Sequence, residues 1–260
     1  MADLRGRDRL IVALDVPTTD DALALAGKLE SEVGFFKIGW QLFMTGDVPI
    51  LLERLQEKKL FVDLKVPGDI GNTIRAVVDL CAKKGVRFLT LSDSVPLAAI
   101  ASAKAARGTG PYPKLLMVPL LSSLDASDLE SITGSGNLDQ HIITRSTAAL
   151  GAGCDGLIAS GDAIGVLRRQ HGAEVLIVSP GIRPSGMGAD DHKRFTTPAE
   201  AIGFGADYVV VGRPIRNAAD PLDAARRIID EIDRELDRNR STGSSRGDSP
   251  IQAMYVKGQD

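Results

Sequence analysis

Short apolar runs alternate with longer amphipathic segments along most of the chain. The runs are rich in β-branched residues and lie at 10–15, 35–39, 60–65, 87–91, 114–118, 156–160, 175–179 and 208–212. Nearly every position within a run is apolar, which is typical of parallel strands that are covered on both faces. The pattern therefore predicts eight buried, parallel strands.

Segments with helical periodicity lie between these runs. We expect helices at 19–31, 48–58, 70–84, 95–106, 138–152, 161–170, 198–205 and 219–236. In the third segment, Ile74 and Val78 fall on one face while Arg75 points away from it. Eight strand–helix units in this order predict an α/β fold, a single-domain (β/α)8 TIM barrel. A doubly wound open sheet is disfavoured, because no G-x-G-x-x-G loop follows the first strand.

The end of the chain is polar and lacks this alternation. We predict a barrel domain over residues 1–238 and a flexible tail over 239–260. The apolar runs are too short for a transmembrane helix, and the first residues lack the apolar stretch of a secretory signal. The two cysteines have no metal-ligand spacing. We therefore expect a cytoplasmic protein with reduced thiols.

Basic and acidic residues nearly balance, with 31 Lys and Arg against 34 Asp and Glu. This balance argues against a broad nucleic-acid surface and against a polybasic membrane patch. We expect neither nucleic acid nor a membrane as a partner.

Charged residues stand where strands of the barrel should be buried. Asp15 closes the first run, Lys37 lies within the second, and Asp63 and Lys65 end the third. Residues i and i+2 of a strand share a face, and the carboxyl ends of barrel strands surround the active-site mouth. Buried charges persist when they are paired or functional. With the nearby Asp69, these residues predict a catalytic cluster; a purely structural ion pair is the alternative.

Two glycine–arginine turns follow the last two strands. Gly181 and Arg183 lie in SPGIRPSG (179–186), and Gly212 and Arg213 lie in VVVGRPI (209–215). Loops at this place in such barrels frequently bind phosphate through backbone N–H groups, and arginine adds bidentate donors. The sequence therefore predicts a phosphorylated small molecule as the ligand.

An ordered set of motifs resembles the orotidine 5′-monophosphate decarboxylase family over about residues 9–236. The motifs are VALDVP (12–17), FKIG (36–39), DLK…DIGNT (63–73), SSLD (122–125), SPGIRP (179–184), DDHKR…TPAEAI (190–202) and ADYVVVGRPI (206–215). The resemblance implies cofactor-independent and metal-independent decarboxylation of orotidine 5′-monophosphate to uridine 5′-monophosphate, in pyrimidine biosynthesis. It also implies a homodimer whose subunits share their active sites.

The resemblance also implies a role for each matching residue. In the catalytic group, Lys65 is the proton donor, Asp63 faces the substrate carboxylate, and Lys37 and Asp69 complete the charged network. In the binding group, Asp15 holds the ribose, and Ser122 and Ser123 bind the pyrimidine. The phosphate is bound by Gly212, Arg213 and Arg183. Asp69, Ile70 and Thr73 are expected to reach the neighbouring subunit's site, and His192 to contact phosphate and base.

Three positions depart from the family pattern. Three residues (66–68) separate Lys65 from Asp69 where the family has two, and we expect a bulged turn to absorb the extra one. Ser92 replaces a common histidine, and His192 replaces a common glutamine. These departures leave open a noncatalytic nucleotide-binding paralogue. A metal-dependent sugar-phosphate lyase of the same barrel superfamily is the other alternative, because such enzymes resemble this chain in the Asp63-x-Lys65 pair; they carry an acidic metal ligand in the region that Lys37 occupies here.

Overall fold

Eight parallel strands close into a barrel. The computed structural model describes residues 4–67, 72–184 and 196–241. The strands are β1 (Leu10–Ala13), β2 (Phe35–Gly39), β3 (Lys59–Val66), β4 (Phe88–Leu91), β5 (Lys114–Met117), β6 (Gly156–Ile158), β7 (Leu176–Ser179) and β8 (Tyr208–Val211). Each strand pairs with its neighbour in sequence, and β8 pairs with β1. The predicted (β/α)8 barrel is confirmed.

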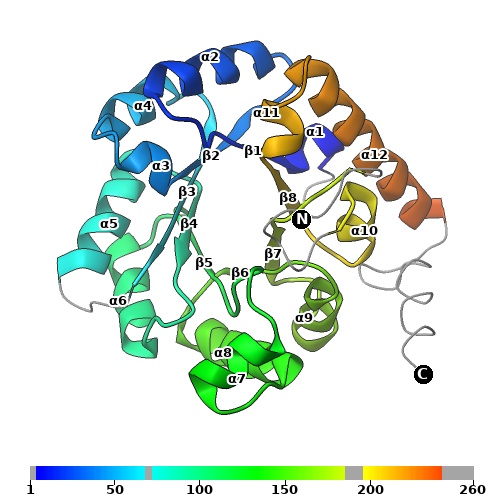
Figure 1. The fold of residues 1–260 in the computed structure, drawn as a ribbon. Helices are drawn as coiled ribbons and strands as arrows, with labels where there is room; N and C mark the ends of the chain where they lie inside the picture. Colours follow the sequence, from blue (N-terminus) through cyan, green and yellow to red (C-terminus); the bar gives the residue numbers. More distant parts are fainter. Residues whose placement is uncertain (1–3, 68–71, 185–195, 242–260) are drawn as a thin grey trace.

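Helices form a ring around the strands (Figure 1). They are α1 (Gly6–Arg9), α2 (Thr19–Leu29), α3 (Trp40–Phe43), α4 (Val48–Arg54), α5 (Asn72–Lys83), α6 (Leu97–Arg107), α7 (Ala126–Thr133), α8 (Leu138–Ala152), α9 (Ala163–His171), α10 (Pro198–Gly203), α11 (Arg213–Arg216) and α12 (Pro221–Ser241). Each predicted helix is present; α8 has the predicted bounds, and the other helices have shifted ends. The short helices α1, α3, α7 and α11 were not predicted, and three of them have only four residues, too few to show a helical period.

Helix α12 continues beyond the predicted end at residue 236. Glu235 is 1% exposed, and Arg238 Nη1 donates to its carboxylate at 2.8 Å. This ion pair lets the polar last turns of the helix pack against the barrel. The hydrophobic pattern of the sequence does not reveal such a contact. Residues 239–241 of the predicted tail belong to this helix, which corrects the predicted boundary; residues 242–260 lie outside the described residues, so the rest of the tail stays a prediction.

The barrel has an outer and an inner core. On β1, Leu10 and Val12 pack outward against the helices, while Ile11 and Ala13 point into the barrel. Four aromatic rings fill the amino-terminal end of the interior, with centroid separations of 5.0–5.8 Å; they belong to Phe35, Phe61, Phe88 and Tyr208. These rings close one end of the cylinder, so an internal cavity can open only at the other.

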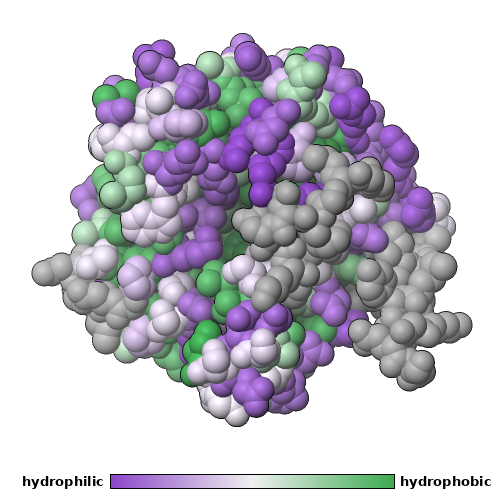
Figure 2. All heavy atoms as spheres, viewed as in Figure 1, coloured by the Kyte–Doolittle hydropathy of each residue, from purple (hydrophilic) through white to green (hydrophobic). Residues whose placement is uncertain are grey.

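The open end carries the polar side chains. Seen from the same side as Figure 1, hydrophilic residues gather near the centre of this face, over β1, β2 and α11 (Figure 2). No helix within the described ranges is long and apolar enough to cross a membrane.

Candidate active site

A cavity of about 410 Å³ opens at the carboxyl ends of the strands. This volume lies in the range of small-molecule sites. Its floor is apolar and is made by Ala13, Phe61, Val118, Ile158 and Val210. Its walls carry charged and polar side chains from β2 and β3 and from the segments that follow β1, β2, β5, β6, β7 and β8. The cavity therefore combines a dry floor with a charged rim.

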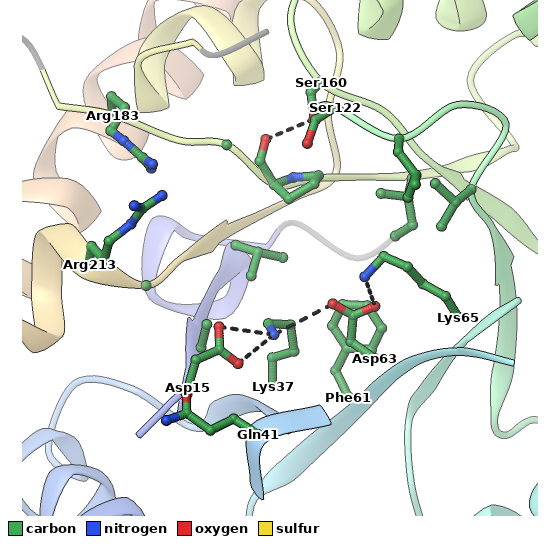
Figure 3. A pocket seen from close by; sticks show the side chains of 18 of the residues that line it. Asp15, Lys37, Gln41, Phe61, Asp63, Lys65, Ser122, Ser160, Arg183 and Arg213 are labelled. Atoms are coloured by element: carbon green, nitrogen blue, oxygen red, sulfur yellow. Dashed lines mark hydrogen bonds and ion pairs between the residues drawn. The ribbon is translucent and has the colours of Figure 1, made fainter. Parts of the chain in front are cut away.

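Four charged side chains form an alternating network on one side of this cavity (Figure 3). Lys37 Nζ lies 2.9 Å from Asp15 Oδ1 and 3.5 Å from Asp63 Oδ2. Lys65 Nζ lies 3.0 Å from Asp63 Oδ1. The order Asp15, Lys37, Asp63, Lys65 places each carboxylate beside at least one ammonium group, so these four members of the predicted cluster lie together.

The network shifts the ionisation of its two most buried members. Burial alone would lower the pKa of Lys37, but the carboxylates of Asp63 and Asp15 outweigh it and raise that pKa. Burial alone would raise the pKa of Asp63, but the ammonium groups of Lys37 and Lys65 outweigh it and lower that pKa. Both groups are therefore firmly charged at neutral pH.

Lys65 reaches this network through an irregular strand. The register pairs Val62 with Leu89 and then Val66 with Leu91, so three residues of β3 face Thr90 alone. Lys65 adopts a φ of 46°, the only positive φ of a non-glycine residue in the described ranges. This conformation costs a residue with a Cβ about 1–2 kcal/mol. Such strain clusters at functional sites and persists only where neighbouring contacts hold it.

This bulge corrects one detail of the sequence analysis. Simple strand alternation was expected to place Asp63 beside Lys65, but the side chains meet across the bulge instead. The bulged turn expected at residues 66–68 extends outside the described residues and stays a prediction. The observed register shift lies upstream of Val66 and depends on how β3 aligns with β4, which the sequence of one strand does not reveal.

Two arginines lie across the cavity from Lys65. Figure 3 shows the guanidinium groups of Arg183 and Arg213 pointing toward one another, with Lys65 on the far side. Arg183 is 5% exposed, and its backbone N–H donates to Thr196 O at 2.8 Å. Gly181 has a φ of 76°, which lets the chain turn sharply before Arg183. The two predicted glycine–arginine turns therefore converge on one wall.

Most of the predicted site residues that the structure describes line this cavity. They are Asp15, Lys37, Asp63, Lys65, Ser122, Arg183, Gly212 and Arg213. Ser123 is exposed beside the cavity and Thr73 is exposed on α5, and neither is among the residues that line it. Asp69, Ile70 and His192 lie outside the described residues.

Sequence analysis did not anticipate several wall residues. Gln41, Ser160 and Arg216 also line the cavity. Ser160 Oγ donates to Pro180 O at 3.1 Å, and Arg216 Nη1 donates to Asp15 O. Ser160 could have been found, because it is a polar residue directly after an apolar strand. Arg216 and Gln41 lie on helices too short to predict.

Thr90 is a further residue of the charged network that sequence analysis did not predict. It is 1% exposed, and its hydroxyl donates to Asp63 Oδ1 at 2.9 Å. A lone polar residue within the apolar strand β4 was the available signal. Within the described residues, no group of three or more His, Cys, Asp and Glu side chains is arranged to hold a metal ion.

The sequence matches a known family over most of its length. Residues 8–228 match the family described as "Orotidine 5′-phosphate decarboxylase / HUMPS family". The chain belongs to this family. The matched region therefore contains all eight strands and every residue that lines the cavity.

Relatives of the family from several organisms agree with this assignment. The chain is 46% identical over 233 residues to an orotidine 5′-phosphate decarboxylase of Rhodopseudomonas palustris (strain BisB5), covering 89% of this chain and 97% of the relative. It is 42% identical over 228 residues to one of Methylococcus capsulatus, covering 85% and 90%. The crystal structure of the Lactobacillus acidophilus orotidine 5′-phosphate decarboxylase superposes with a TM-score of 0.71 at 31% identity, covering 86% and 98%.

Proposed function

We propose that this protein decarboxylates orotidine 5′-monophosphate to uridine 5′-monophosphate, in pyrimidine biosynthesis. The observation that carries the proposal is charge complementarity. Five basic side chains and two carboxylates line the cavity, a net charge of three positive. The substrate carries a carboxylate and a phosphate, the latter contributing about −1.5 to −2 at neutral pH. The cavity therefore nearly balances the charge of this substrate.

The placement of the charges also fits the two ends of the substrate. The arginine wall suits the phosphate, because guanidinium groups bind phosphate oxygens bidentately. The network around Lys65 then lies beside the pyrimidine and its carboxylate. Ser122, on the wall between these groups, suits the polar edge of the pyrimidine, with Ser123 close by. The ribose would lie near Asp15.

Lys65 is the proposed proton donor. As the bond between carbon 6 and the carboxylate breaks, its electron pair stays on carbon 6 and CO₂ leaves. The Lys65 ammonium stabilises this negative charge and transfers a proton to carbon 6, forming the new C–H bond; the amine then regains a proton from water. Preorganised charge in a water-excluded site is usually the largest catalytic contribution.

Asp63 and Lys37 are proposed to keep that ammonium in place. Asp63 contacts Lys65 directly, and Lys37 neutralises the other Asp63 oxygen. An adjacent carboxylate favours the protonated amine, so the proton remains available until carbon 6 takes it. The same carboxylate faces the departing group, which favours loss of the substrate carboxylate. Asp69 is proposed to join this network.

We further propose a cytoplasmic homodimer with shared sites. Trp40, Phe43 and Met44 on or beside α3 are 50%, 41% and 75% exposed, an apolar surface that a second subunit would cover. Thr73, with Asp69 and Ile70, would then contribute to the partner's cavity, and His192 would contact the phosphate and base. The test is complementation: a mixture of inactive Lys65→Ala and Asp69→Ala chains should regain activity, because one hybrid site is intact.

A metal-dependent sugar-phosphate lyase is the weaker reading. Lys37 lies between the two carboxylates that a metal ion would need, and it neutralises both. An ammonium group in that position repels a divalent cation. Activity that persists in excess chelator is the result expected from our proposal.

The decisive experiment follows the ultraviolet absorbance of orotidylate. Wild-type protein should deplete it and form uridylate, whereas Lys65→Ala should abolish turnover and still bind uridylate. Lys114→Ala is the matched control, because this lysine pairs with Asp155 at 3.4 Å at the opposite end of the barrel. Absence of turnover by the wild type would favour the noncatalytic nucleotide-binding paralogue. Near-normal turnover by Lys65→Ala would reject Lys65 as the donor.

A further inference from the structure

The peptide group that precedes Lys65 is held at both ends by side chains. Its carbonyl, Leu64 O, accepts a hydrogen bond from Trp40 Nε1 at 2.9 Å. Its N–H, Lys65 N, donates to Thr90 Oγ1 at 2.9 Å. Because a peptide group is planar and rigid, two bonds to its opposite ends fix its orientation. That orientation sets where the Lys65 side chain begins.

These contacts replace the usual strand ladder. On one side β3 pairs with β2 as far as Asp63, and on the other its pairing with β4 resumes only at Val66. Leu64 and Lys65 therefore have no registered partner in the described strands. Buried backbone groups need hydrogen bonds, and here an indole and a hydroxyl supply them.

Thr90 also connects the backbone of Lys65 to the end of its side chain. The amide N–H can only donate, so the Thr90 hydroxyl accepts there and donates its own hydrogen to Asp63 Oδ1 at 2.9 Å. Lys65 Nζ lies 3.0 Å from that same oxygen. One buried hydroxyl thus positions both the start of the lysine and the carboxylate that orients its ammonium group.

We propose that Thr90 and Trp40 are positioning residues that hold Lys65 in its left-handed conformation and so aim its ammonium group at the reacting carbon. The inference rests on the proposed function, since it acts through the proton donor. Neither residue needs to touch the substrate. Small displacements of a catalytic group from its productive geometry are enough to slow the chemical step.

The test compares Thr90→Val, which keeps the shape, with Thr90→Ser, which keeps the hydroxyl. Thr90→Val should lower kcat at least tenfold, about 1.4 kcal/mol of activation free energy. Its KM and its affinity for uridylate should change less than about threefold, because the phosphate contacts are on the opposite wall. Thr90→Ser should restore kcat to within about threefold of wild type. A merely structural role would not separate kcat from KM, and a packing role of the methyl group would be kept in Thr90→Val and lost in Thr90→Ser.

Trp40 provides an independent pair of variants. Trp40→Phe removes the indole N–H, whereas Phe43→Leu removes the ring that packs 5.3 Å from the indole but leaves the donor. Both residues lie on the surface assigned to the second subunit, so the two variants are compared after gel filtration shows that each has the oligomeric state of the wild type. We then expect a fall in kcat of about threefold to tenfold for Trp40→Phe and a clearly smaller one for Phe43→Leu, which keeps the indole donor. Ser146→Ala, which removes a fully buried hydroxyl outside the cavity, controls for loss of a buried hydrogen bond.

The outcomes separate this inference from the proposed function. If the wild type turns over orotidylate and Lys65→Ala does not, the function stands; normal kcat in Thr90→Val then overturns positioning by Thr90. Equal loss in Thr90→Val and Thr90→Ser also overturns it, since the hydroxyl that Thr90→Ser keeps would then not account for the loss. If Thr90→Val does not fold, the Trp40 pair decides, and equal kcat for Trp40→Phe and Phe43→Leu refutes the proposal. An inactive wild type refutes both.

Discussion

Replacing Lys37 with methionine tests whether the charged network is a single coupled unit. Lys37→Met keeps the length of the side chain and removes the ammonium group that lies between two carboxylates. Asp63 then keeps Lys65 as its cationic neighbour, and the Asp15 carboxylate loses the ammonium group 2.9 Å away. The uncompensated charge should destabilise the fold at neutral pH.

The structure sets the size of this effect. Removing one member of a fully buried ion pair costs about 3–5 kcal/mol, because the remaining charge is left in a poorly solvating environment. The Asp63 side chain is 16% exposed and should approach this cost, whereas the Asp15 side chain is 37% exposed and is partly solvated. We therefore expect Lys37→Met to lower the free energy of unfolding by about 2–3 kcal/mol at pH 7.

The pH dependence has a defined sign. The pKa of Asp63 is lowered below its ordinary value of 3.8, so its contribution is present above about pH 4 and is lost as the pH falls through its folded pKa. The pKa of Lys37 is raised above 10.5, so its contribution is lost only as the pH rises through that raised value. In Lys37→Met, Asp63 takes up a proton more readily. The difference between variant and wild type should therefore shrink as the pH falls from 7 toward 4.

Urea unfolding followed by circular dichroism measures this difference at both pH values. Lys83→Met is the control, because that lysine forms an exposed pair with Asp79, the two side chains being 70% and 52% exposed; it should cost less than about 0.5 kcal/mol. A Lys37→Met effect no larger than the control, or one that is equal at both pH values, would refute the coupled network.

Three further predictions follow from the same geometry. In Gly39→Ala the added Cβ would lie 2.9 Å from the Asp15 carboxylate, so kcat/KM should fall at least tenfold. The control Gly27→Ala, whose added Cβ has nothing within 4 Å, should retain activity, and equal activities of the two variants would contradict the prediction. Arg213→Ala should lower kcat/KM by about 10- to 100-fold, because Arg213 lines the cavity. Arg226 is exposed, so Arg226→Ala is the control and should leave kcat/KM unchanged. Steady-state kinetics at two salt concentrations measure both variants. Burial raises the pKa of the Cys81 and Cys154 thiols to about 12. At pH 8 an aromatic disulfide reagent should therefore label the native protein far more slowly than the unfolded chain. Rapid labelling of the native protein would disprove this prediction.

The strands were predictable because both faces of each are buried. Apolar runs marked all eight strands, and several runs extend past the carboxyl end of the observed strand for a physical reason. Asp15, Ser160 and Gly212 lie one or two residues beyond the ends of β1, β6 and β8, where the chain leaves the ladder to form the mouth of the cavity. Hydrophobicity reports burial, and it does not report the place where hydrogen-bonded pairing stops.

The convergence of the charged residues was also predictable, but the way they are held was not. Asp15, Lys37 and Asp63 stand at or near the ends of neighbouring strands, so the barrel topology brings them together. The contacts of Thr90 and Trp40 depend on the register of β3 against β4 and on a four-residue helix after β2. These are non-local properties, which periodicity within one segment cannot encode.

The left-handed backbone of Lys65 has a consequence for attempts to make this barrel more robust. Glycine is the residue that occupies such a conformation at least cost, so the main chain and the chemistry favour different amino acids at this position. Directed selection for thermal tolerance alone would relax the local geometry by discarding the amine. Robust descendants of this sequence therefore need to be screened for turnover as well as for survival on heating, and consensus-style substitutions are best kept away from β3 and the residues that brace it.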